Sequence, residues 1–289
     1  MPLTNMTGKI CIVTGANSGI GKETTLGLAQ MGARVVMVCR NAQKGKAALE
    51  EIWRESGSSQ VDLLIADVSS HASVRALAEQ IQQKFHRLDV LVNNAGGAWP
   101  ARTLSADGIE MTLATNHLGA ALLTLLLLDL LKASAPSRII NISSEAQRRT
   151  RLDMNDLQFE RRKYRGLVAY GQSKLLMNAF TFELARRLVG TGVTANCLHP
   201  GVVATNIWSA NPAPLIGRLI IAVVKPFMLT SKQGAAVPLY LATSPEAAQV
   251  SGEYFVKSRL AKSNPLSRDP KLMSEVWQCT GKMTNLPLA

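Results

Sequence analysis

The sequence predicts an α/β fold: a single doubly wound domain with a mostly parallel sheet of seven strands and helices on both faces. Short apolar, β-branched runs alternate with segments of helical spacing as far as residue 256. A glycine-rich turn separates the first apolar run from the first helix. No repeat or linker divides the 289 residues, of which 47% are hydrophobic. We therefore expect residues 1–289 to form one domain around a sizeable core.

The first strand and helix carry the motif around which the rest of the chain is arranged. Residues 10–13 are typical of a strand buried on both faces, and residues 22–31 have helical spacing. Glycines between them let backbone N–H groups approach a phosphate at the helix N-terminus. The candidate cofactor-binding residues here are Gly15, Asn17, Ser18, Gly19, Ile20 and Gly21. This context predicts a Rossmann-type dinucleotide site, with a plain strand-to-helix turn as the alternative.

An ATP-binding P-loop is the nearest competing motif, and the sequence excludes it. Ala16 stands where that motif requires its first glycine. Lys22 is followed by Glu23 instead of Ser or Thr, so the hydroxyl that would bind magnesium is missing.

The second strand, residues 34–39, ends at Arg40. Dinucleotide folds that prefer NAD usually carry an acidic residue near this point, where it binds the ribose 2′-hydroxyl. Arg40 and Lys44 would instead pair with a 2′-phosphate. A solvated arginine at the start of a helix is the alternative. We expect NADP(H) as the cofactor.

The third and fourth strands end in residues that suit a binding crevice. Residues 61–66 lead into Asp67, whose carboxylate can accept a hydrogen bond from adenine or cap the helix that begins near Ser70. Residues 90–92 run into small and amide side chains, which suit a crevice wall or a simple turn. The candidate cofactor-binding residues here are Asp67, Val68, Asn94, Ala95 and Gly96.

A long helix is predicted over residues 106–132. Asn116 lies in it among apolar neighbours and needs hydrogen-bond partners, so it is either a satisfied core amide or a catalytic one. The leucine-rich face of residues 122–131 is expected to pack on the sheet or on a second subunit.

The fifth strand, residues 138–142, precedes Ser144 and a basic interval, residues 145–165. Charge runs of this kind are usually solvated, and the alternative is a contact with an acidic partner or membrane headgroups. Tyr170 and Lys174 follow on the next helix, one turn apart on one face. An ammonium group there would lower the pKa of the tyrosine from about 10 and favour proton exchange near neutral pH. By itself, the spacing is also typical of a surface pair.

The sixth strand, residues 193–198, makes a sharp exit at the carboxyl edge of the sheet, where the nicotinamide end of a dinucleotide would lie. The candidate cofactor-binding residues there are Pro200, Gly201, Val203 and Thr205. Residues 215–229 are apolar with charged interruptions, and they fit a lid over an apolar substrate, a helix dipping into lipid, or core packing. Residues 254–256 are expected to close the sheet.

Composition limits the classes of partner. The formal net charge of +12 would suit a dinucleotide phosphate or an anionic bilayer, but 5% aromatic residues and no recognition motif argue against nucleic acid. The four cysteines form no metal-spaced pair, so we expect reduced thiols, an intracellular setting and no metal site. Residues 118–131 are too short to cross a bilayer, and residues 1–8 lack the apolar core of a signal peptide. We expect a cytoplasmic protein, with peripheral membrane contact left open.

Taken in order, these motifs resemble the short-chain dehydrogenase/reductase family over residues 7–256. The resemblance is carried by Thr14-Gly15-Ala16-Asn17-Ser18-Gly19-Ile20-Gly21, Asp67, Asn93-Asn94-Ala95-Gly96, Asn116, Ser144, Tyr170 with Lys174, and Pro200-Gly201. The chain is most similar to the retinol dehydrogenase branch because of Cys39-Arg40, the 26-position interval from Ser144 to Tyr170, and His199-Pro200-Gly201. Light-dependent protochlorophyllide reductases share much of the pattern.

The resemblance implies hydride transfer between a nicotinamide and a carbonyl or alcohol carbon. Tyr170 would donate the proton, and Ser144 would orient the carbonyl oxygen. Lys174 would hold the nicotinamide ribose and lower the pKa of Tyr170, while Asn116 would fix a water that relays protons. These four residues are the candidate catalytic set.

The expected function is therefore an NADP(H)-dependent oxidoreductase that interconverts a lipophilic aldehyde, ketone or retinal-like compound and its alcohol. The alternatives are a light-dependent enzyme like protochlorophyllide reductase and a dinucleotide-binding regulatory protein without catalysis. Residues 206–230 are expected to form a substrate lid and residues 257–289 a C-terminal extension. Relatives often dimerise through the helices that would here span residues 107–132 and 170–189, which leaves a homodimer open.

Overall fold

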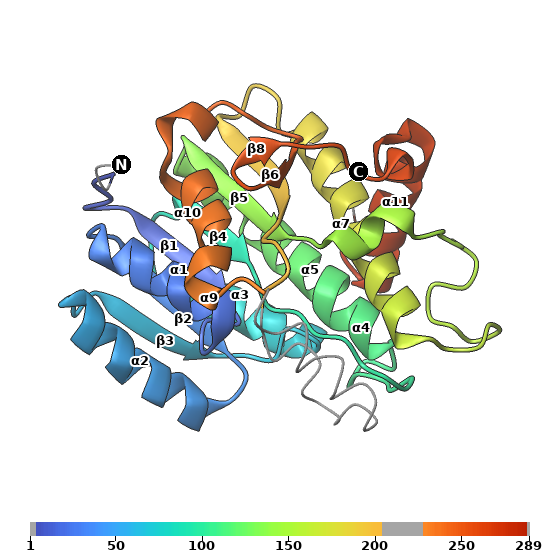
Figure 1. The fold of residues 1–289 in the computed structure, drawn as a ribbon, viewed down its shortest axis with the longest axis horizontal. Helices are drawn as coiled ribbons and strands as arrows, with labels where there is room; N and C mark the ends of the chain where they lie inside the picture. The colour runs from blue at the N-terminus through green and yellow to red at the C-terminus, as the bar shows by residue number, and fades with distance from the viewer. Residues whose placement is uncertain (1–3, 204–227, 288–289) are drawn as a thin grey trace.

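The computed structural model describes residues 4–203 and 228–287, and within them one sheet of eight strands forms the centre of the molecule (Figure 1). The strand order is β3-β2-β1-β4-β5-β6-β7-β8. The strands are β1 (Ile10–Thr14), β2 (Arg34–Cys39), β3 (Val61–Ile65), β4 (Val90–Asn93), β5 (Ser137–Ile142), β6 (Val193–His199), β7 (Tyr254–Val256) and β8 (Arg259–Leu260). All neighbours from β3 to β7 pair in parallel, so the predicted doubly wound α/β fold is confirmed.

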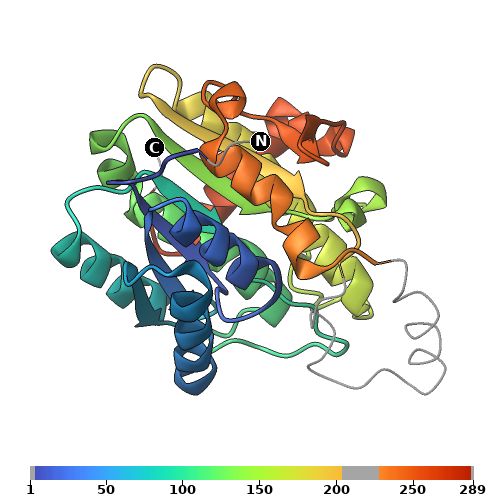
Figure 2. The same cartoon turned by 60° about the vertical axis from the view of Figure 1, so that its left-hand side comes forward.

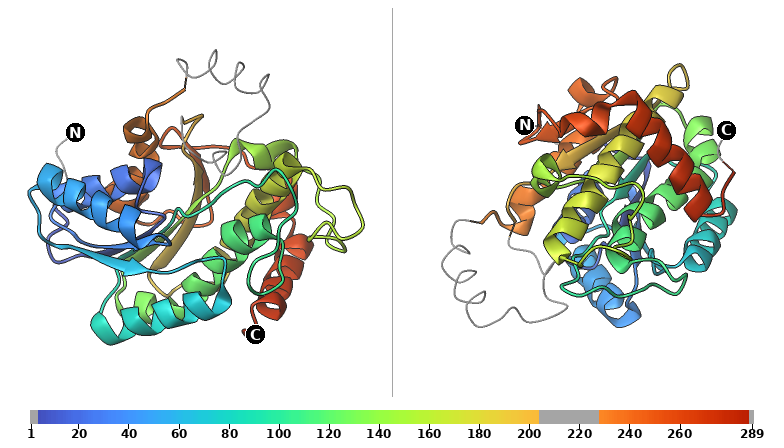
Figure 3. Two further views of the ribbon diagram at one scale, coloured as in Figure 1. Left: turned by 90° about the horizontal axis from the view of Figure 1, so that it is seen from below. Right: turned by 90° about the vertical axis from the view of Figure 1, so that its right-hand side faces the viewer.

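Helices cover both faces of the sheet. Figure 2 shows α1 and α10 side by side on one face, which they share with α2. Helices α3, α5 and α7 cover the other face, and α11 lies outermost against α7 (Figure 3). The helices and helical turns are α1 (Gly19–Gln30), α2 (Ala42–Ser56), α3 (His71–Lys84), α4 (Met111–Leu113), η1 (Ala114–Leu118), α5 (Gly119–Leu126), α6 (Leu128–Ala133), η2 (Glu145–Arg149), α7 (Gly166–Arg187), α9 (Ser231–Gly234), α10 (Ala236–Thr243), η5 (Pro245–Ala247), η6 (Pro265–Arg268) and α11 (Pro270–Met283).

The strands are apolar on both sides because the sheet separates two cores. In β1, Ile12 belongs to the core under α3, α5 and α7, whereas Val13 belongs to the core under α1 and α2. Both side chains are 0% exposed. Successive residues of a strand point to opposite faces, so a strand covered on both sides carries an uninterrupted apolar run.

The eighth strand was not predicted, since the sequence indicated seven. β8 pairs antiparallel with β7 through Phe255 opposite Leu260 and Val256 opposite Arg259. The two residues between them, Lys257 and Ser258, have φ angles of 50° and 57°. A two-residue hairpin turn with both residues at positive φ usually contains Asn or Gly. Lys-Ser therefore gave no hairpin signal in the sequence.

The long helix predicted over residues 106–132 is interrupted. It begins only at α4, where the buried Glu110 carboxylate accepts hydrogen bonds from the N–H groups of Thr112 and Leu113 at 2.9 and 2.8 Å. The π-helical turn η1, called the π turn below, follows α4, and Leu127 separates α5 from α6. Long-range partners of the π turn account for this irregularity, as described below.

Other predicted boundaries shift by a few residues. The third strand ends at Ile65 instead of residue 66, and α1 begins at Gly19 instead of residue 22. Thr205 and nearly all of the predicted lid, residues 206–230, lie outside the described residues.

The face of α7 that the sequence left open to a second subunit is packed within the chain. Residues 169–185 are all buried, and Leu175, Phe180 and Leu184 are each 0% exposed. α11 covers the outer side of α7. None of the helices in residues 4–203 and 228–287 combines the length and apolarity needed to cross a bilayer.

Candidate active site

A cleft of about 910 Å³ opens at the carboxyl ends of the central strands. The strand order reverses between β1 and β4, and a crevice at such a point is where open α/β sheets bind ligands. The predicted residues that line this cleft are Gly15, Asn17, Ser18, Gly19, Ile20, Arg40, Lys44, Asp67, Val68, Asn94, Ala95, Gly96, Ser144, Tyr170, Lys174, Pro200, Gly201 and Val203. Two others, Gly21 and Asn116, do not line the cleft.

The glycine turn between β1 and α1 fits a phosphate group. Gly15 has a φ of +66°, and a Cβ there would come 2.9 Å from the Cα of Ala95. A Cβ on Gly21 would overlap the carbonyl oxygen of Gly15, so Gly21 is needed for packing behind the turn. The side chain of Ser18, the N-cap residue of α1, makes no capping hydrogen bond. The first N–H groups of α1 are therefore available to an anion in the cleft.

Asn94 holds the end of β4 against the glycine turn. Its Nδ2 donates to the carbonyl oxygens of Thr14 at 2.8 Å and Gly15 at 3.3 Å. The N–H groups of Asn94 and Ala95 both donate to the Thr14 hydroxyl at 3.0 Å. These bonds fix the distance between the glycine turn and the cleft wall, so the amide side chain of Asn94 has a structural task in addition to lining the cleft.

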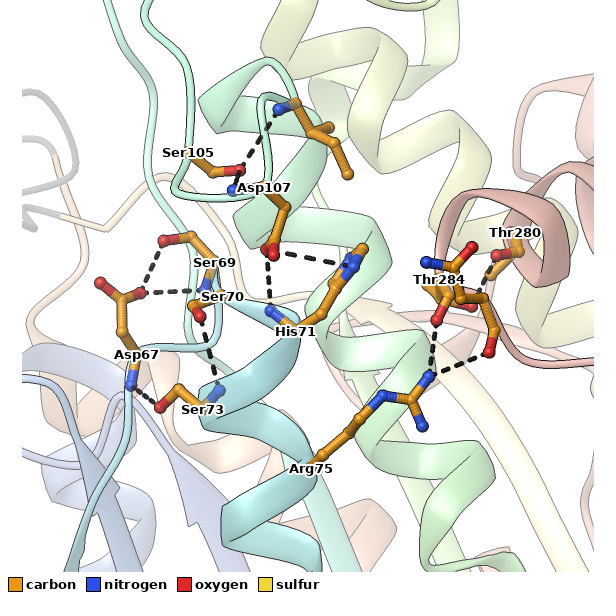
Figure 4. Close-up of polar contacts among 12 residues, drawn as sticks. Asp67, Ser69, Ser70, His71, Ser73, Arg75, Ser105, Asp107, Thr280 and Thr284 are labelled. Atoms are coloured by element: carbon orange, nitrogen blue, oxygen red, sulfur yellow. Dashed lines mark hydrogen bonds and ion pairs between the residues drawn. The ribbon is translucent and has the colours of Figure 1, made fainter.

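The end of the cleft at β2 and β3 carries the two charged residues that the sequence analysis assigned to the adenosine part of a cofactor. The Arg40 side chain is 68% exposed and lies 3.7 Å from the carboxylate of Asp67. Asp67 does not cap α3. Its carboxylate accepts two hydrogen bonds from Ser69, one from the N–H at 2.9 Å and one from the hydroxyl at 2.7 Å (Figure 4). The cap is Ser70, whose Oγ accepts from the N–H of Ser73. The predicted capping role of Asp67 is therefore wrong, and its contact with adenine stays a prediction.

Ser144, Tyr170 and Lys174 meet at the carboxyl end of β5. Tyr170, on α7, shares a hydrogen bond with the Ser144 hydroxyl. Lys174, one turn later, donates from Nζ to the carbonyl oxygen of Ile142 at 2.8 Å and lies 5.7 Å from the centre of the Tyr170 ring. Burial lowers the pKa of Lys174 to about 8. At neutral pH its side chain is therefore still mostly an ammonium group.

The pKa of Tyr170 differs from the prediction. The sequence predicted that Lys174 lowers it, but burial raises the pKa of Tyr170 above its ordinary value, and the Ser144 hydrogen bond lowers it by less. The phenol is 8% exposed, and the ammonium group is turned toward the Ile142 carbonyl. Tyr170 is thus a protonated phenol at neutral pH, which suits a proton donor.

Asn116 lies in the π turn, directly behind the cleft wall. Its Nδ2 donates to the carbonyl oxygen of Gly97 at 2.9 Å and to Oγ of Ser173 at 3.0 Å, and its Oδ1 accepts from the N–H of Gly97 at 2.8 Å. A Cβ on Gly96 would come 3.0 Å from Asn116 Oδ1 and 3.4 Å from Lys174 Nζ. Asn116 is therefore a fully bonded amide that adjoins the Lys174 ammonium across Gly96.

Several apolar residues of the cleft were not among the predicted site residues. Trp99, Leu167 and Val202 are examples, and the last two are 67% and 61% exposed. Leu167 stands three residues before Tyr170 on α7, a spacing that could have marked it as a neighbour of the reacting group. The carbonyl oxygen of Trp99 lies 3.1 Å from the Tyr164 hydroxyl, whose single hydrogen it shares with the Glu110 carboxylate at 2.9 Å.

Comparison with known proteins bears on this site. The family model described as short chain dehydrogenase matches residues 9–214. Human retinol dehydrogenase 13 is 42% identical over 287 residues, which cover 96% of this chain and 85% of the relative.

Two solved structures share the fold. An uncharacterised protein from Mycobacterium paratuberculosis has a TM-score of 0.81 and 29% identity, with 99% of this chain and 98% of the other covered. RhlG of Pseudomonas aeruginosa, in an active-site complex with NADP, has a TM-score of 0.68 and 27% identity, with 88% and 96% covered.

Proposed function

Because the chain belongs to the short-chain dehydrogenase/reductase family and to its retinol dehydrogenase branch, we propose that it uses NADP(H) to interconvert a lipophilic carbonyl compound and its alcohol. The family membership makes the protein an oxidoreductase of alcohols and carbonyl compounds. One observation supports the proposed cofactor and reaction: Tyr170, Ser144 and Lys174 line the same cleft as the glycine turn.

The cofactor would be held along the whole cleft. The first N–H groups of α1 would bind the pyrophosphate, and Asp67 would accept a hydrogen bond from the adenine amino group. Arg40 and Lys44 would pair with the 2′-phosphate. The exposed ion pair between Arg40 and Asp67 is weak enough for the guanidinium to turn toward a phosphate. The NADP complex of RhlG supports this choice of cofactor.

The bound nicotinamide supplies the hydride, with its two electrons, for the carbonyl carbon of the substrate. The carbonyl oxygen takes the proton of the Tyr170 hydroxyl, so the product is the neutral alcohol and the residue becomes a phenolate. Ser144, which shares a hydrogen bond with Tyr170, would donate a second hydrogen bond to the same oxygen. The Lys174 ammonium, 5.7 Å from the ring, stabilises the phenolate until a proton from solvent restores Tyr170. Alcohol oxidation uses the same groups in reverse.

The cleft wall supports an apolar substrate. Leu167 and Val202 expose their side chains beside the catalytic group, and Trp99 lines the same cleft. An apolar chain attached to the carbonyl would remove these side chains from water. The name of the relative, retinol dehydrogenase 13, is consistent with such a substrate.

The test is oxidation of NADPH, followed by absorbance, with retinal, medium-chain aldehydes, aromatic ketones and steroids, and with NADH in parallel. We expect turnover of a lipophilic carbonyl with NADPH preferred. Tyr170→Phe should abolish turnover and leave NADPH binding nearly unchanged, whereas the control Tyr240→Phe, on α10 outside the cleft, should keep full activity. Substantial activity in Tyr170→Phe would refute the mechanism.

Cofactor preference is tested separately. Arg40→Asp should move the preference toward NADH, because a carboxylate repels the 2′-phosphate and accepts from the 2′-hydroxyl. Arg54→Asp makes the same charge change at an exposed position at the far end of α2 and should not alter the NADPH to NADH ratio. An unchanged ratio in Arg40→Asp would exclude its contact with the 2′-phosphate.

A further inference from the structure

The C-terminal helix α11 lies beyond the segment matched by the family model, and it packs against α7 and the π turn. Its Trp277 ring stacks on Phe180 of α7 with ring centroids 5.5 Å apart. Val276 of α11 is 1% exposed. Figure 3 shows α11 along the outer side of α7. This apolar packing brings one polar residue of α11, Thr280, to the π turn.

A buried hydrogen bond of fixed direction joins α11 to the π turn. The Thr280 hydroxyl donates to the carbonyl oxygen of Val276 at 2.7 Å, as serine and threonine hydroxyls in helices often do. Its oxygen must therefore accept from Nε2 of His117, which lies 2.9 Å away. Burial lowers the pKa of His117 to about 3, so the ring is neutral with its hydrogen on Nε2. The Nδ1 atom has no partner among the described residues.

The far end of α11 is fastened to a different element. Arg75 of α3 donates from Nη2 to the carbonyl oxygens of Thr284 at 2.8 Å and Asn285 at 3.1 Å (Figure 4). These carbonyls lie at the C-terminal end of α11, where a helix leaves such groups unbonded and favours a cation. The position of Thr280 is thus set by α3 as well as by α7.

The residue before His117 is Asn116, whose amide bonds reach the cleft wall. They contact both backbone groups of Gly97, which lines the cleft, and the hydroxyl of Ser173, next to Lys174. A π-helical turn is rare and is frequently found at functional sites. Here Gly97 and Ser173 hold its Asn116 side chain on one side, and Thr280 of α11 holds its His117 side chain on the other.

We propose that α11 positions the catalytic group: Thr280, acting through His117, sets the register of the π turn and so the place of the Asn116 amide beside Gly96 and Lys174. This inference rests on the proposed function, in which Lys174 serves proton transfer, and on the role that the family resemblance implies for Asn116, which is to fix a water that relays protons. Thr280 and His117 are positioning residues, since neither lines the cleft. Ala16 of the glycine turn and Cys39, which precedes Arg40, belong to the core on the other face of the sheet, so we expect cofactor binding by these two segments not to depend on the His117–Thr280 bond.

The experiment compares Thr280→Val, which keeps the shape and removes the hydroxyl, with Thr280→Ser, which keeps the hydroxyl. We expect kcat to fall about tenfold in Thr280→Val, as a small misplacement near the reacting atoms can cost still more. The KM for NADPH should change by less than about twofold, and Thr280→Ser should stay near the parent value. In an Asn116→Ala background, Thr280→Val should cost no further activity, because both act through the same amide.

A second readout does not need turnover. Hydrogen–deuterium exchange of the peptide over residues 111–119 should be faster in Thr280→Val than in the parent and unchanged in Thr280→Ser. If the parent turns over no carbonyl compound, the proposed function fails, while this exchange still tests the link between α11 and the π turn. Unchanged exchange, or a lowered melting temperature with kcat retained, would refute the positioning role. If Thr280→Val disturbs the packing, Thr280→Ala, which also removes the hydroxyl, can be compared with Thr280→Ser in the same way.

Discussion

Removing the charge of Lys174 should stabilise the protein while it destroys activity. The side chain is 4% exposed, and burial lowers its pKa from 10.5 to about 8. Between these two pH values the unfolded chain binds more protons than the native one, so stability rises with pH across that window. Below pH 8 the full cost of the buried charge is present. The difference of 2.5 units between the two pKa values corresponds to a cost of about 3 kcal/mol in the free energy of unfolding.

The variant Lys174→Met keeps the length of the side chain and loses the charge. It also leaves the carbonyl oxygen of Ile142 without the 2.8 Å bond from the Nζ ammonium, which costs about 2 kcal/mol. The expected net gain at pH 7 is therefore about 1 kcal/mol in the free energy of unfolding. The gain should shrink as pH rises from 8 toward 10.5, where the native lysine of the parent is already neutral.

The assay is urea unfolding of the cofactor-free protein at several values between pH 6 and 10, since bound cofactor would add its own stabilisation. Lys46→Met, on the exposed face of α2, is the matched control and should change stability by less than about 0.5 kcal/mol at every pH. Turnover of NADPH should be lost in Lys174→Met alone. A variant less stable than the parent at pH 7, or a difference that does not vary with pH, would refute the reasoning.

Two other substitutions test the packing behind the cleft and the charge of a carboxylate outside it. In Gly119→Ala, the new Cβ would overlap the carbonyl oxygen of Val68, so the free energy of unfolding, measured from unfolding midpoints, should fall by about 1–3 kcal/mol. NADPH affinity should fall with it. A variant with the stability and affinity of the parent would contradict this. For Asp156, burial alone would raise the pKa, but hydrogen bonds from the N–H of Glu160 and from Arg162 prevail and lower it to about 2. This stabilisation is present above pH 3.8 and is lost as the pH falls toward 2. Asp156→Asn should therefore lower the melting temperature at pH 7 and match the parent near pH 2, and an equal difference at both pH values would argue against a charge effect.

Local signals were enough to predict the parallel strands and the cleft. Buried strands such as β1 and β6 are short apolar runs, and the glycine turn has to follow the first of them. The ends of parallel strands share one edge of the sheet, so residues placed at those ends come together in space. For that reason Arg40, Asp67 and Ser144 all line the observed cleft although they are far apart in the sequence.

Features that depend on distant partners could not be predicted in the same way. Regular helical spacing continues through residues 114–118, and the π turn forms there because Asn116 bonds to Gly97 and Ser173, which are 19 and 57 positions away. The pKa of Tyr170 was predicted from its spacing to Lys174 alone. Burial instead raises this pKa, and the burial results from packing around α7, which the spacing of two residues cannot predict.

The C-terminal helix is another feature that the sequence could not predict, and it supports the site. α11 carries no motif, and His117, its polar partner, lies 163 positions from Thr280. The sequence therefore left two readings for the apolar residues of α7, namely core or subunit interface. In the structure α11 covers them: Phe180 stacks on Trp277, and Arg187 lies over the same indole, 4.3 Å from its centre. Support for the helix that carries Tyr170 and Lys174 thus comes from a segment of the same chain, and any surface that displaces α11 would also release the His117–Thr280 bond.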